Sequence, residues 1–323
     1  MKVGFWLKAA AFAACMASSI ALAQSFPTKP ITMLIPFAAG GPTDVVGRLV
    51  GEHMSRTLGQ PVIIENAVGA AGTLAGQRLM AAPADGHVIL IGHTGTHAAA
   101  VSLNPNLKYR PVEDFAPVGL VNTNPIFLTV RKTHPSATLS EFVAWVKANE
   151  KAASNAHAGV GSVSHTTCLL FNTVVGVKPN GVPYRGTGPA MNDLVAGQVD
   201  YLCDQAVNVV PQHRAGTIKT LAVASTARAT ALPDVPTIAE AGLPGYAVEP
   251  WFGVYGPSGL PPAIVEVLNA AFVEALGAPE VKDKLLQAGF NPKASSAAEL
   301  AALTASEYEK FGKIAREAKI TIE

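Results

Sequence analysis

The alternation of short apolar runs with amphipathic segments is the feature that most restricts the fold of this chain. The run ITMLI at residues 31–35 precedes a segment in which Val46, Val50 and Met54 share one helical face, and Gly59 ends the pattern. PVIIEN followed by AVGAAGTLAGQRLMAA repeats this plan, and HVILIGH begins it a third time. Such alternation predicts a mostly parallel sheet with helices on its faces.

The pattern changes near residue 117, where PVGLVNTNPIFLTVR reads as two extended runs separated by Asn124 and Pro125. We interpret this as the first crossing between two lobes, because a second series of strands and helices follows. The segment ALPDVPTIAEAGLPG is expected to lie back beside the first lobe, which the helical remainder of the chain covers. The sequence therefore predicts an α/β, two-lobed fold with a hinge and a cleft. Lobe 1 takes residues 24–122, lobe 2 takes residues 123–225, and residues 226–323 return to lobe 1 with C-terminal helices.

The amino terminus has the features of a cleaved secretory signal peptide over residues 1–23. Lys2 and Lys8 accompany an apolar stretch that ends in ALA at residues 21–23, an A-x-A cleavage signal. A membrane anchor is the alternative, but the stretch contains small residues and serines and falls short of the roughly 20 apolar residues that span a bilayer. Lipidation at Cys15 is disfavoured because Phe12 stands where a branched aliphatic residue is usual. We expect export to the periplasm.

The charge balance excludes several classes of partner. The chain has 24 Lys and Arg against 23 Asp and Glu, so no strongly basic field favours nucleic acid. After the signal segment no apolar run approaches bilayer length, which predicts a soluble mature protein of about two domains.

Two cysteines remain after the signal segment, Cys168 and Cys203. In an oxidising compartment they can pair as a disulfide or remain thiols, and the sequence leaves both possibilities open. Neither has a second cysteine at C-x-x-C spacing, so no metal site is predicted.

A glycine-rich turn, PFAAGGPTD, follows the first apolar run at residues 36–44. Gly40 and Gly41 allow positive φ angles or close approach of a ligand, Pro42 restricts the turn, and Thr43 or Asp44 can cap the helix that begins there. In an open parallel sheet, ligands bind where strands end and helices begin. The amides and the positive end of the helix dipole favour an anion, although such turns also serve plain chain reversal.

A glycine-rich, polar helix start occurs twice more in the chain. Residues 69–73, GAAGT, open the second helix, and residues 159–165, GVGSVSH, open one in the other lobe. Two of these polar helix starts lie in one lobe and one in the other. Together they predict that a small carboxylate is held from both sides by backbone amides, hydroxyls and water.

Other polar residues have both ligand-binding and structural interpretations. Arg185, in the string YRGT, can form a forked hydrogen bond with a carboxylate or a surface salt bridge. Thr94 lies between His93 and His97 at the end of the third strand, where these side chains can line the cleft. Zinc needs further ligands, and none is spaced suitably.

The strand VDYLC leads to Asp204 and Gln205. Gln205 is expected to close the far end of the pocket, and Asp204 to brace a loop, because an unpaired carboxylate repels an anion. Trp251 and Phe252 fit either an apolar wall, which suits an aromatic acid, or core packing.

An enzyme is the contrasting hypothesis. Ser162, Ser164 and His165 with Asp44 or Asp204 suggest a hydrolase triad, which would make this a secreted serine hydrolase. The local string GSVSH lacks the G-x-S-x-G nucleophile elbow, however, and adjacent residues at a helix start diverge. A dinucleotide site fails for lack of the third glycine. Binding without catalysis is preferred.

The chain resembles, over its whole mature length, the extracytoplasmic receptors of tripartite tricarboxylate transporters, the Bug family. The resemblance is carried by FPTKPITMLIPFAAGGPTDVVGRLVGEHMSRTLGQPVIIEN, GAAGT, PADGHVILIG, GSVSH, VPYRGTGPAMNDLVAGQVDYLCDQ, LPDVPTIAEAGLPGY and WFGVYGPSGLP. It departs where family members commonly have a proline pair and this chain has Ala38-Ala39, and where they have Arg-Pro and this chain has Ala67-Val68.

This resemblance implies a two-lobed periplasmic-binding-protein fold of the Venus-flytrap kind, type II, without catalysis or cofactor. It implies capture of a carboxylate, often a dicarboxylate, and delivery to a membrane permease with a large and a small subunit. The first ligand loop falls on residues 37–44 and the facing loop on residues 161–165. The predicted ligand-binding residues are Phe37, Ala39, Gly40, Gly41, Thr43, Asp44, Gly72, Thr94, Gly161, Ser162, Ser164, His165, Arg185 and Gln205.

The identity of the acid stays open between a small aliphatic diacid and an aromatic one such as a phthalate isomer. The chain is expected to act as a monomer that closes on its ligand. A receptor that signals to a sensor partner in place of a permease is the alternative, because many receptors of this family lack an adjacent permease.

Overall fold

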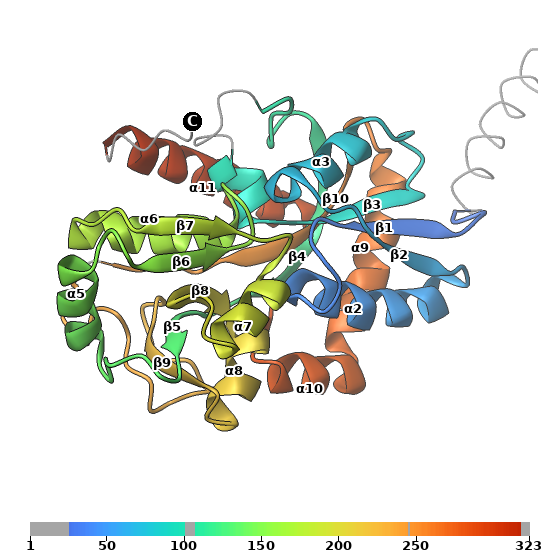
Figure 1. Ribbon diagram of the computed structural model, residues 1–323. Helices are drawn as coiled ribbons and strands as arrows, with labels where there is room; N and C mark the ends of the chain where they lie inside the picture. The colour runs from blue at the N-terminus through green and yellow to red at the C-terminus, as the bar shows by residue number, and fades with distance from the viewer. Residues whose placement is uncertain (1–25, 101–106, 245, 318–323) are drawn as a thin grey trace, which may run out of the picture.

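Two β-sheets, each covered by helices on both faces, form the two lobes of the molecule (Figure 1). The computed structural model describes residues 26–100, 107–244 and 246–317. The predicted signal peptide at residues 1–23 lies outside the described residues. A six-stranded sheet has the order β11-β4-β10-β3-β1-β2, and a five-stranded sheet has the order β7-β6-β8-β5-β9. The predicted α/β architecture with two lobes is confirmed.

The first lobe is built from both ends of the chain. Its elements are β1 (Ile31–Ile35), α2 (Pro42–Leu58), β2 (Val62–Asn66), the 3-10 turn η1 (Ala70–Gly72), α3 (Thr73–Met80), β3 (Val88–His93), the π-helical turn η2 (Gly95–Ala99), β4 (Phe115–Thr123), β10 (Trp251–Pro257), α9 (Pro262–Gly277), α10 (Pro279–Gln287), β11 (Asn291–Pro292) and α11 (Ala297–Glu317).

The second lobe comes from the middle of the chain. Its elements are β5 (Ile126–Arg131), α5 (Leu139–Ala148), β6 (Ser154–His157), α6 (Val163–Val175), β7 (Asn180–Pro183), α7 (Thr187–Val195), β8 (Tyr201–Gln205), α8 (Ala206–Arg214) and β9 (Ile218–Val223).

Both sheets are mixed, whereas the sequence predicted mostly parallel ones. β1 pairs in parallel with β2 and β3, and β6 pairs in parallel with β7 and β8. β5 and β10, which enter a sheet directly from the other lobe, are antiparallel to their neighbours, and the short β11 is antiparallel to β4. β5 is antiparallel to β8 and β9, and β10 is antiparallel to β3 and β4. A strand that starts at the cleft runs away from it, while the strands of β-α units run toward it.

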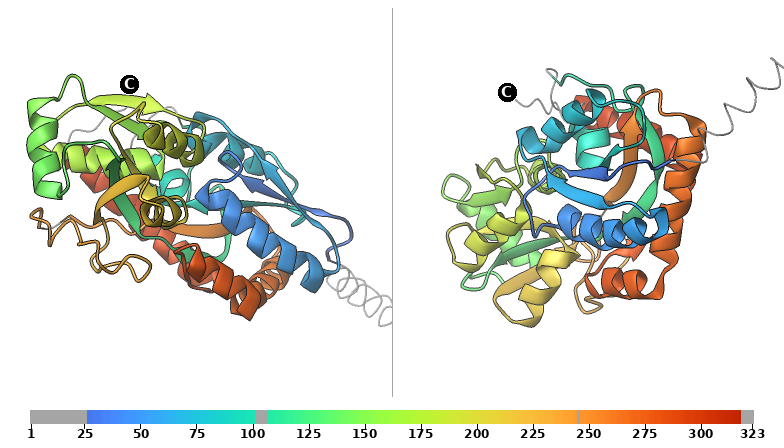
Figure 2. Two further views of the ribbon diagram at one scale, coloured as in Figure 1. Left: turned by 60° about the horizontal axis from the view of Figure 1, so that its bottom comes forward. Right: turned by 90° about the vertical axis from the view of Figure 1, so that its right-hand side faces the viewer.

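The alternation of side chains along each strand explains the layers. In the first sheet Met33 packs with Val50 of α2 and Phe272 of α9, whereas Leu34 packs on the opposite face with Leu79 of α3. α9 runs along α2 on the outer face of this sheet (Figures 1 and 2). These fully apolar layers make each lobe a compact body of its own.

The segment that follows β9 packs on the second lobe, so its predicted place beside the first lobe is wrong. Leu232 and Val235 join Phe127 in one apolar cluster of the second lobe. The Tyr246 hydroxyl donates a 2.7 Å hydrogen bond to the carbonyl of Thr167 in α6. This segment adds apolar residues to both clusters of the second sheet, beside the helices that cover it, which is why its hydrophobic residues face that sheet.

The two crossings between the lobes lie next to each other. Asn124 and Pro125 connect β4 to β5, and the return passes through Pro250 before β10. The amide of Asn124 donates a 2.8 Å hydrogen bond to the carbonyl of Pro250. Such a paired crossing is a natural hinge, because few backbone torsions there move one lobe against the other.

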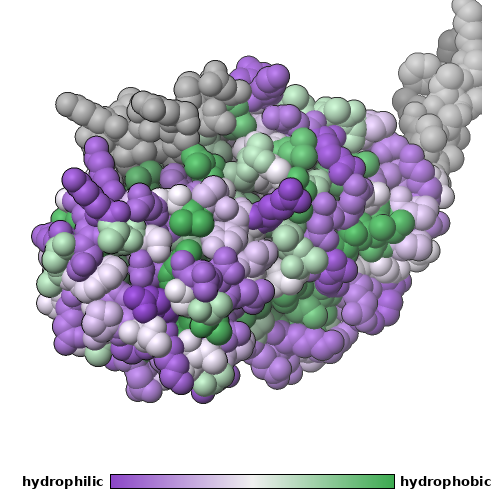
Figure 3. Space-filling model, viewed as in Figure 1, coloured by the Kyte–Doolittle hydropathy of each residue, from purple (hydrophilic) through white to green (hydrophobic). Residues whose placement is uncertain are grey.

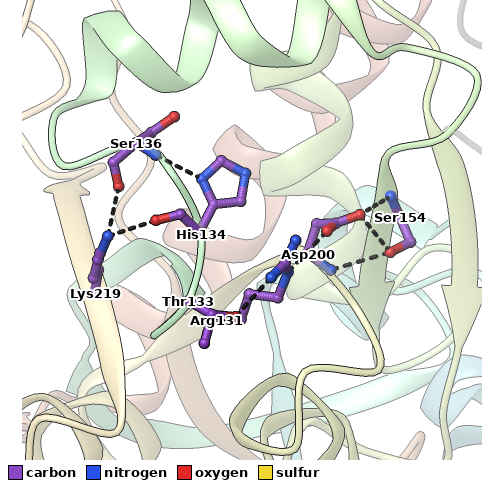
Figure 4. A network of polar contacts seen from close by, with 7 residues as sticks. All are labelled: Arg131, Thr133, His134, Ser136, Ser154, Asp200 and Lys219. Atoms are coloured by element: carbon purple, nitrogen blue, oxygen red, sulfur yellow. Dashed lines mark hydrogen bonds and ion pairs between the residues drawn. The ribbon is translucent and has the colours of Figure 1, made fainter.

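A polar network fixes the end of the second sheet that is remote from the cleft (Figure 4). Arg131 at the end of β5 pairs with Asp200 at 3.1 Å, and Asp200 accepts hydrogen bonds from the amide and hydroxyl of Ser154 at 2.9 Å. Lys219 donates to the carbonyl of His134 at 2.5 Å. These bonds tie β5, β6, β8 and β9 together, so that the opposite ends of these strands are held in place.

The surface shown in Figure 3 is mainly hydrophilic, with hydrophobic residues in small separate patches. Among the described residues, no helix has both the length and the apolar character to cross a membrane.

Candidate functional site

A small cavity with a volume of about 40 Å³ lies between the lobes. The first lobe lines it with Phe37, Gly41, Pro42, Thr43, His93 and Phe252, and the second with Ile126, Ala158, Ser162, Val163, Ser164, Thr187, Cys203, Asp204 and Gln205. These residues belong to the ends of β1, β3, β6 and β8 and to the helix starts that follow, where ligands of open α/β sheets bind.

The first-lobe wall is the turn from β1 into α2. Gly40 has a φ of 80°, Gly41 is the N-cap residue of α2, and Pro42 occupies the first helical turn. No side chain caps this helix, so the prediction that Thr43 or Asp44 does so is wrong. The amide groups of the first turn therefore remain available to an anion.

Asp44 braces this turn from behind instead of capping it. Its carboxylate accepts hydrogen bonds from the amide of Gly40, from Asn66 and from both Nε and a terminal nitrogen of Arg48, each at 2.9 Å. Burial opposes ionisation of Asp44, but the hydrogen bonds from Arg48, Gly40 and Asn66 together outweigh it and lower its pKa. Asp44 was predicted to bind the ligand. In the structure its hydrogen bonds hold the turn and the residues beside it, and it does not line the cavity.

The second-lobe wall is the turn from β6 into α6. Ser162 is the N-cap residue, and its Oγ accepts from the amide of His165 at 3.3 Å. The Oγ of Ser164 accepts from the amide of Ala158 at 2.9 Å and lies 3.1 Å from the Oγ of Ser162. Both serines line the cavity, so the residues that hold the turn also border the cavity.

Two histidines hold this turn by accepting hydrogen bonds from its backbone amides. His157 accepts from the amide of Gly159 and His165 from the amide of Gly161, each through Nδ1 at 3.2 Å. The rings lie 4.6 Å apart, and burial lowers the pKa of His165 to about 4. Neutral rings are needed here, because a protonated Nδ1 does not accept a hydrogen bond.

The inner end of the cavity, the part that Thr187, Asp204 and Gln205 line, is polar. Asp204 is 1% exposed and accepts from the amide of Gln205 and from Nδ2 of Asn208, both at 2.8 Å. Burial raises the pKa of Asp204 to about 6, against the hydrogen bonds from Asn208, Thr187 and Gln205.

His93 faces this end from the first lobe. Its Nδ1 accepts from the amide of Gly95 at 2.8 Å, and burial lowers its pKa to about 3. The ring is therefore neutral with its hydrogen on Nε2, and Nε2 is buried without a hydrogen-bond partner among the described residues. His93 thus offers a donor to a guest in the cavity that it lines.

A disulfide joins the two second-lobe elements that carry the site. Cys168 of α6 and Cys203 of β8 are bonded, with a Cα–Cα distance of 5.6 Å, so of the two possibilities left open by the sequence the structure has the disulfide. Cys203 itself lines the cavity. The bond fixes the serines of α6 against the end of β8.

The predicted ligand-binding residues fall into two groups. Those in the cavity lining are Phe37, Gly41, Thr43, Ser162, Ser164 and Gln205. Those outside it are Ala39, Gly40, Asp44, Gly72, Thr94, Gly161, His165 and Arg185. Most of the second group shape the loops: Thr94, for example, accepts from the amide of Trp251 at 2.9 Å through its hydroxyl.

Gly72 and Arg185 lie on the walls of an outer groove, which shares Phe37 and Ala158 with the cavity. Arg185 is exposed there, and its carbonyl accepts a 3.2 Å hydrogen bond from the amide of Ala38. This bond crosses from one lobe to the other beside the cavity. The structure therefore represents a closed arrangement of the lobes.

The prediction omitted several residues of the cavity. His93, Thr187, Asp204 and Phe252 were each considered near the site but left out of the predicted set. Their common signal is their position at the cleft end of a strand or the start of a helix. Phe252 lines the cavity, whereas its neighbour Trp251 packs in the apolar cluster on the other face of the sheet.

The two lobes, the paired crossings and the cavity between the lobes are the features of a solute-binding protein. A family model confirms this: residues 46–320 match the tripartite tricarboxylate transporter family receptor, and the chain belongs to that family. The resemblance seen in the sequence is thereby confirmed. The family consists of solute-binding receptors, so the chain is a receptor and not an enzyme.

Solved structures and relatives agree with this assignment. The chain is 46% identical to MatC from Rhodopseudomonas palustris with bound malate, with a TM-score of 0.86 over 90% of this chain and 99% of that one. It is 36% identical to the periplasmic binding protein BugD, with a TM-score of 0.89 over 92% and 100% of the chains. An R. palustris protein in complex with adipate is 33% identical, with a TM-score of 0.88 over 92% and 100%.

Among other relatives, a protein encoded in the TAR-I ttuE-ttuC' intergenic region of Agrobacterium vitis is 40% identical over 303 residues, which are 93% of this chain and 87% of that protein. BugT of Bordetella pertussis is 32% identical over 296 residues, 91% of each chain.

Proposed function

We propose that this receptor captures a small aliphatic dicarboxylate in the cavity and delivers it to a tripartite permease with a large and a small membrane subunit. The observation that carries the proposal is the meeting of two helix starts from opposite lobes, α2 and α6, in one enclosed cavity. Their amides and hydroxyls suit a carboxylate group.

The dimensions of the cavity favour an aliphatic acid over an aromatic one. The cavity has a volume of only about 40 Å³. A flexible chain of four to six carbons adapts to such a narrow space better than a rigid ring. Two relatives of similar fold hold malate and adipate, which are acids of this kind.

Capture requires motion of the lobes. A ligand held by Thr43 in the first lobe and by Ser162 and Ser164 in the second gains all these contacts only when the lobes are closed. The ligand therefore stabilises the closed state by its additional contacts there. A closed receptor is the form that a permease can distinguish from an empty one.

The proposed place of action is the periplasm, reached after cleavage of residues 1–23. The apolar amino terminus with its A-x-A signal supports export. BugD, a relative of the same fold, is a periplasmic binding protein.

Isothermal titration of the chain from residue 24 onward tests the ligand class. Succinate, malate, adipate and phthalate are the test ligands, with a neutral sugar and a divalent cation as controls. The proposal predicts binding of at least one aliphatic diacid and weaker binding of phthalate. Binding of the sugar or cation without binding of any acid would refute it.

A matched pair of variants places the ligand. Thr43→Val removes a hydroxyl that lines the cavity, whereas Thr57→Val makes the same change at an exposed position of α2. Loss of one hydrogen bond corresponds to about 1 kcal/mol, or about fivefold in Kd, for Thr43→Val alone. Equal affinity of both variants would place the ligand elsewhere.

Delivery is tested in cells. Deletion of the receptor gene should abolish uptake of the labelled diacid, and the gene for the intact chain should restore it. Unchanged uptake in the deletion strain would show that transport of the diacid does not depend on this receptor.

A further inference from the structure

Asp204 is an unusual residue to find in a cavity for dicarboxylates. Of the described residues, it is the one acidic side chain that lines the cavity, and no lysine or arginine lines it. Its 1% exposure leaves it without solvent to screen its charge. A doubly ionised guest would thus lie beside a buried negative charge with no cation to offset the repulsion.

The neighbours of Asp204 are neutral donors. Gln205 donates through its amide and Asn208 through Nδ2, each at 2.8 Å. Thr187 lies within hydrogen-bonding distance of Nδ2 of Asn208, at 3.0 Å, and also lines the cavity. These bonds hold the carboxyl group in one orientation at the inner end of the cavity.

No charged side chain compensates Asp204 from the elements packed around β8. The titratable and charged groups there are His157 on β6, Arg131 on β5, His165 on α6, Asp193 on α7, His213 and Arg214 on α8, and His93 across the cavity. Arg131 is bonded to Asp200 at the far end of the sheet, and Asp193 accepts from Tyr184. His93, which lines the cavity, and His165, which lies outside its lining, are neutral because burial lowers the pKa of both.

We propose that Asp204 binds the dicarboxylate in its protonated form, so that capture of the dianion takes up one proton from solvent. The neutral carboxyl group then donates a hydrogen bond to a ligand carboxylate instead of repelling it. This inference rests on the proposed function, because it requires an acidic ligand in this cavity.

The pKa of Asp204 is shifted in the direction that the proposal requires. Burial already raises the pKa of Asp204 to about 6 without a ligand. An anion placed beside it raises the pKa further. Near neutral pH the free receptor therefore has a mostly ionised Asp204 and the loaded receptor a protonated one, which is the condition for proton uptake.

Two consequences follow for affinity. Between about pH 7 and pH 9, succinate stays fully ionised. His93 of the cavity, with a pKa of about 3, and His165 of α6, with a pKa of about 4, do not titrate in that range. In that range the affinity should fall by up to about tenfold for each unit of pH increase. An asparagine at this position mimics the neutral acid in shape and carries a fixed donor.

Calorimetric titration with succinate in buffers of different ionisation enthalpy measures the proton directly. We expect uptake of about one proton per bound succinate by the unmodified receptor near pH 8. Asp204→Asn should bind succinate without proton uptake, with little dependence on pH, and more tightly than the unmodified receptor at pH 9. Asp283→Asn, at an exposed position of α10, should behave like the unmodified receptor.

The outcomes separate this inference from the proposed function. If no diacid binds the unmodified receptor, the proposed function fails. If succinate binds without proton uptake, Asp204 remains ionised and only this inference is overturned. Tighter binding of aspartate than of succinate, again without proton uptake, would also overturn it, because the ligand ammonium would then pair with an ionised Asp204. The measurement on the unmodified receptor decides the question even if Asp204→Asn fails to fold.

Discussion

Ser162 offers a test that separates the support of the site from contact with the ligand. Its Oγ caps α6 by accepting from the amide of His165 at 3.3 Å, and the same oxygen lines the cavity 3.1 Å from the Oγ of Ser164. Loss of a serine N-cap to alanine costs about 1 kcal/mol of folding stability. Loss of one hydrogen bond to the ligand costs about 1 kcal/mol of binding, or about fivefold in Kd.

Glycine at the same position separates the two effects. A glycine N-cap costs only a few tenths of a kcal/mol relative to serine. Ser162→Gly and Ser162→Ala lack the hydroxyl alike, so both should lose about fivefold in affinity for a diacid. Only Ser162→Ala should lose about 1 kcal/mol in the free energy of unfolding.

Urea unfolding and calorimetric titration measure these two quantities on the same samples. Ser306→Ala, an exposed serine of α11, is the control and should match the unmodified chain in both. Equal unfolding free energies for the alanine and glycine variants would show that the cap does not stabilise α6. Undiminished affinity in both variants would show that the hydroxyl does not contact the ligand.

Three further predictions concern the frame around the cavity. The disulfide spans a sequence separation of 35, so Cys168→Ala with Cys203→Ala should lower the unfolding free energy by about 4 kcal/mol in urea titrations, and no loss would contradict the entropic account. Because the pKa of Asp44 is lowered in the folded state, its ionised form adds stability that is present above the unfolded pKa of about 4 and lost as pH falls through the folded value. Asp44→Asn should therefore destabilise the protein at neutral pH and progressively less below about pH 4, as measured by thermal unfolding, whereas a constant deficit would contradict this. Gly72 has a φ of 91°, and a Cβ there would lie 3.0 Å from Cζ of Phe37. Gly72→Ala should therefore lower the unfolding free energy by about 1–2 kcal/mol and raise Kd by displacing Phe37. Unchanged stability and affinity of this variant would refute the prediction.

The local part of the site could be predicted from the sequence. Gly41, Thr43, Ser162 and Ser164 occupy the starts of helices that follow strands, and a single strand-turn-helix unit is enough to recognise such a position. The glycines and hydroxyls carry this signal within fewer than ten residues of chain. The structure brings all four into one cavity.

The inner end could not be predicted, because it depends on the order of strands in the sheet. β8 lies between β6 and β5 in space, although it follows both in the chain. This order brings Asp204 into one cavity with the start of α6 and with His93 of the other lobe. The sequence analysis predicted a bracing role for Asp204 because a carboxylate repels an anion, and this reason holds only for the ionised form.

The placement of residues 226–248 failed for a related reason. Leu232, Val235 and Tyr246 are apolar or aromatic residues separated by prolines and glycines, and no helical or strand period tells which lobe they cover. Only the apolar clusters that form around the second sheet decide it. The lobe boundary drawn at residue 226 is therefore too early, since Val248 still donates to the carbonyl of Ala224 at 2.8 Å.

The closed arrangement has a consequence for the affinity of the receptor. The lobes have separate apolar cores and touch beside the cavity through the bond from Ala38 to Arg185, while Asn124 and Pro250 connect them at the hinge. If the lobes close without a ligand, the bond from Ala38 to Arg185 forms. His93 Nε2 then has no hydrogen-bond partner among the described residues, and Asp204 is buried beside an empty cavity. The measured binding energy is then the energy of the ligand contacts reduced by the cost of closing an empty cavity. Relatives with the same two ligand loops can therefore differ in affinity and ligand choice through the inner end of the cavity and the hinge alone.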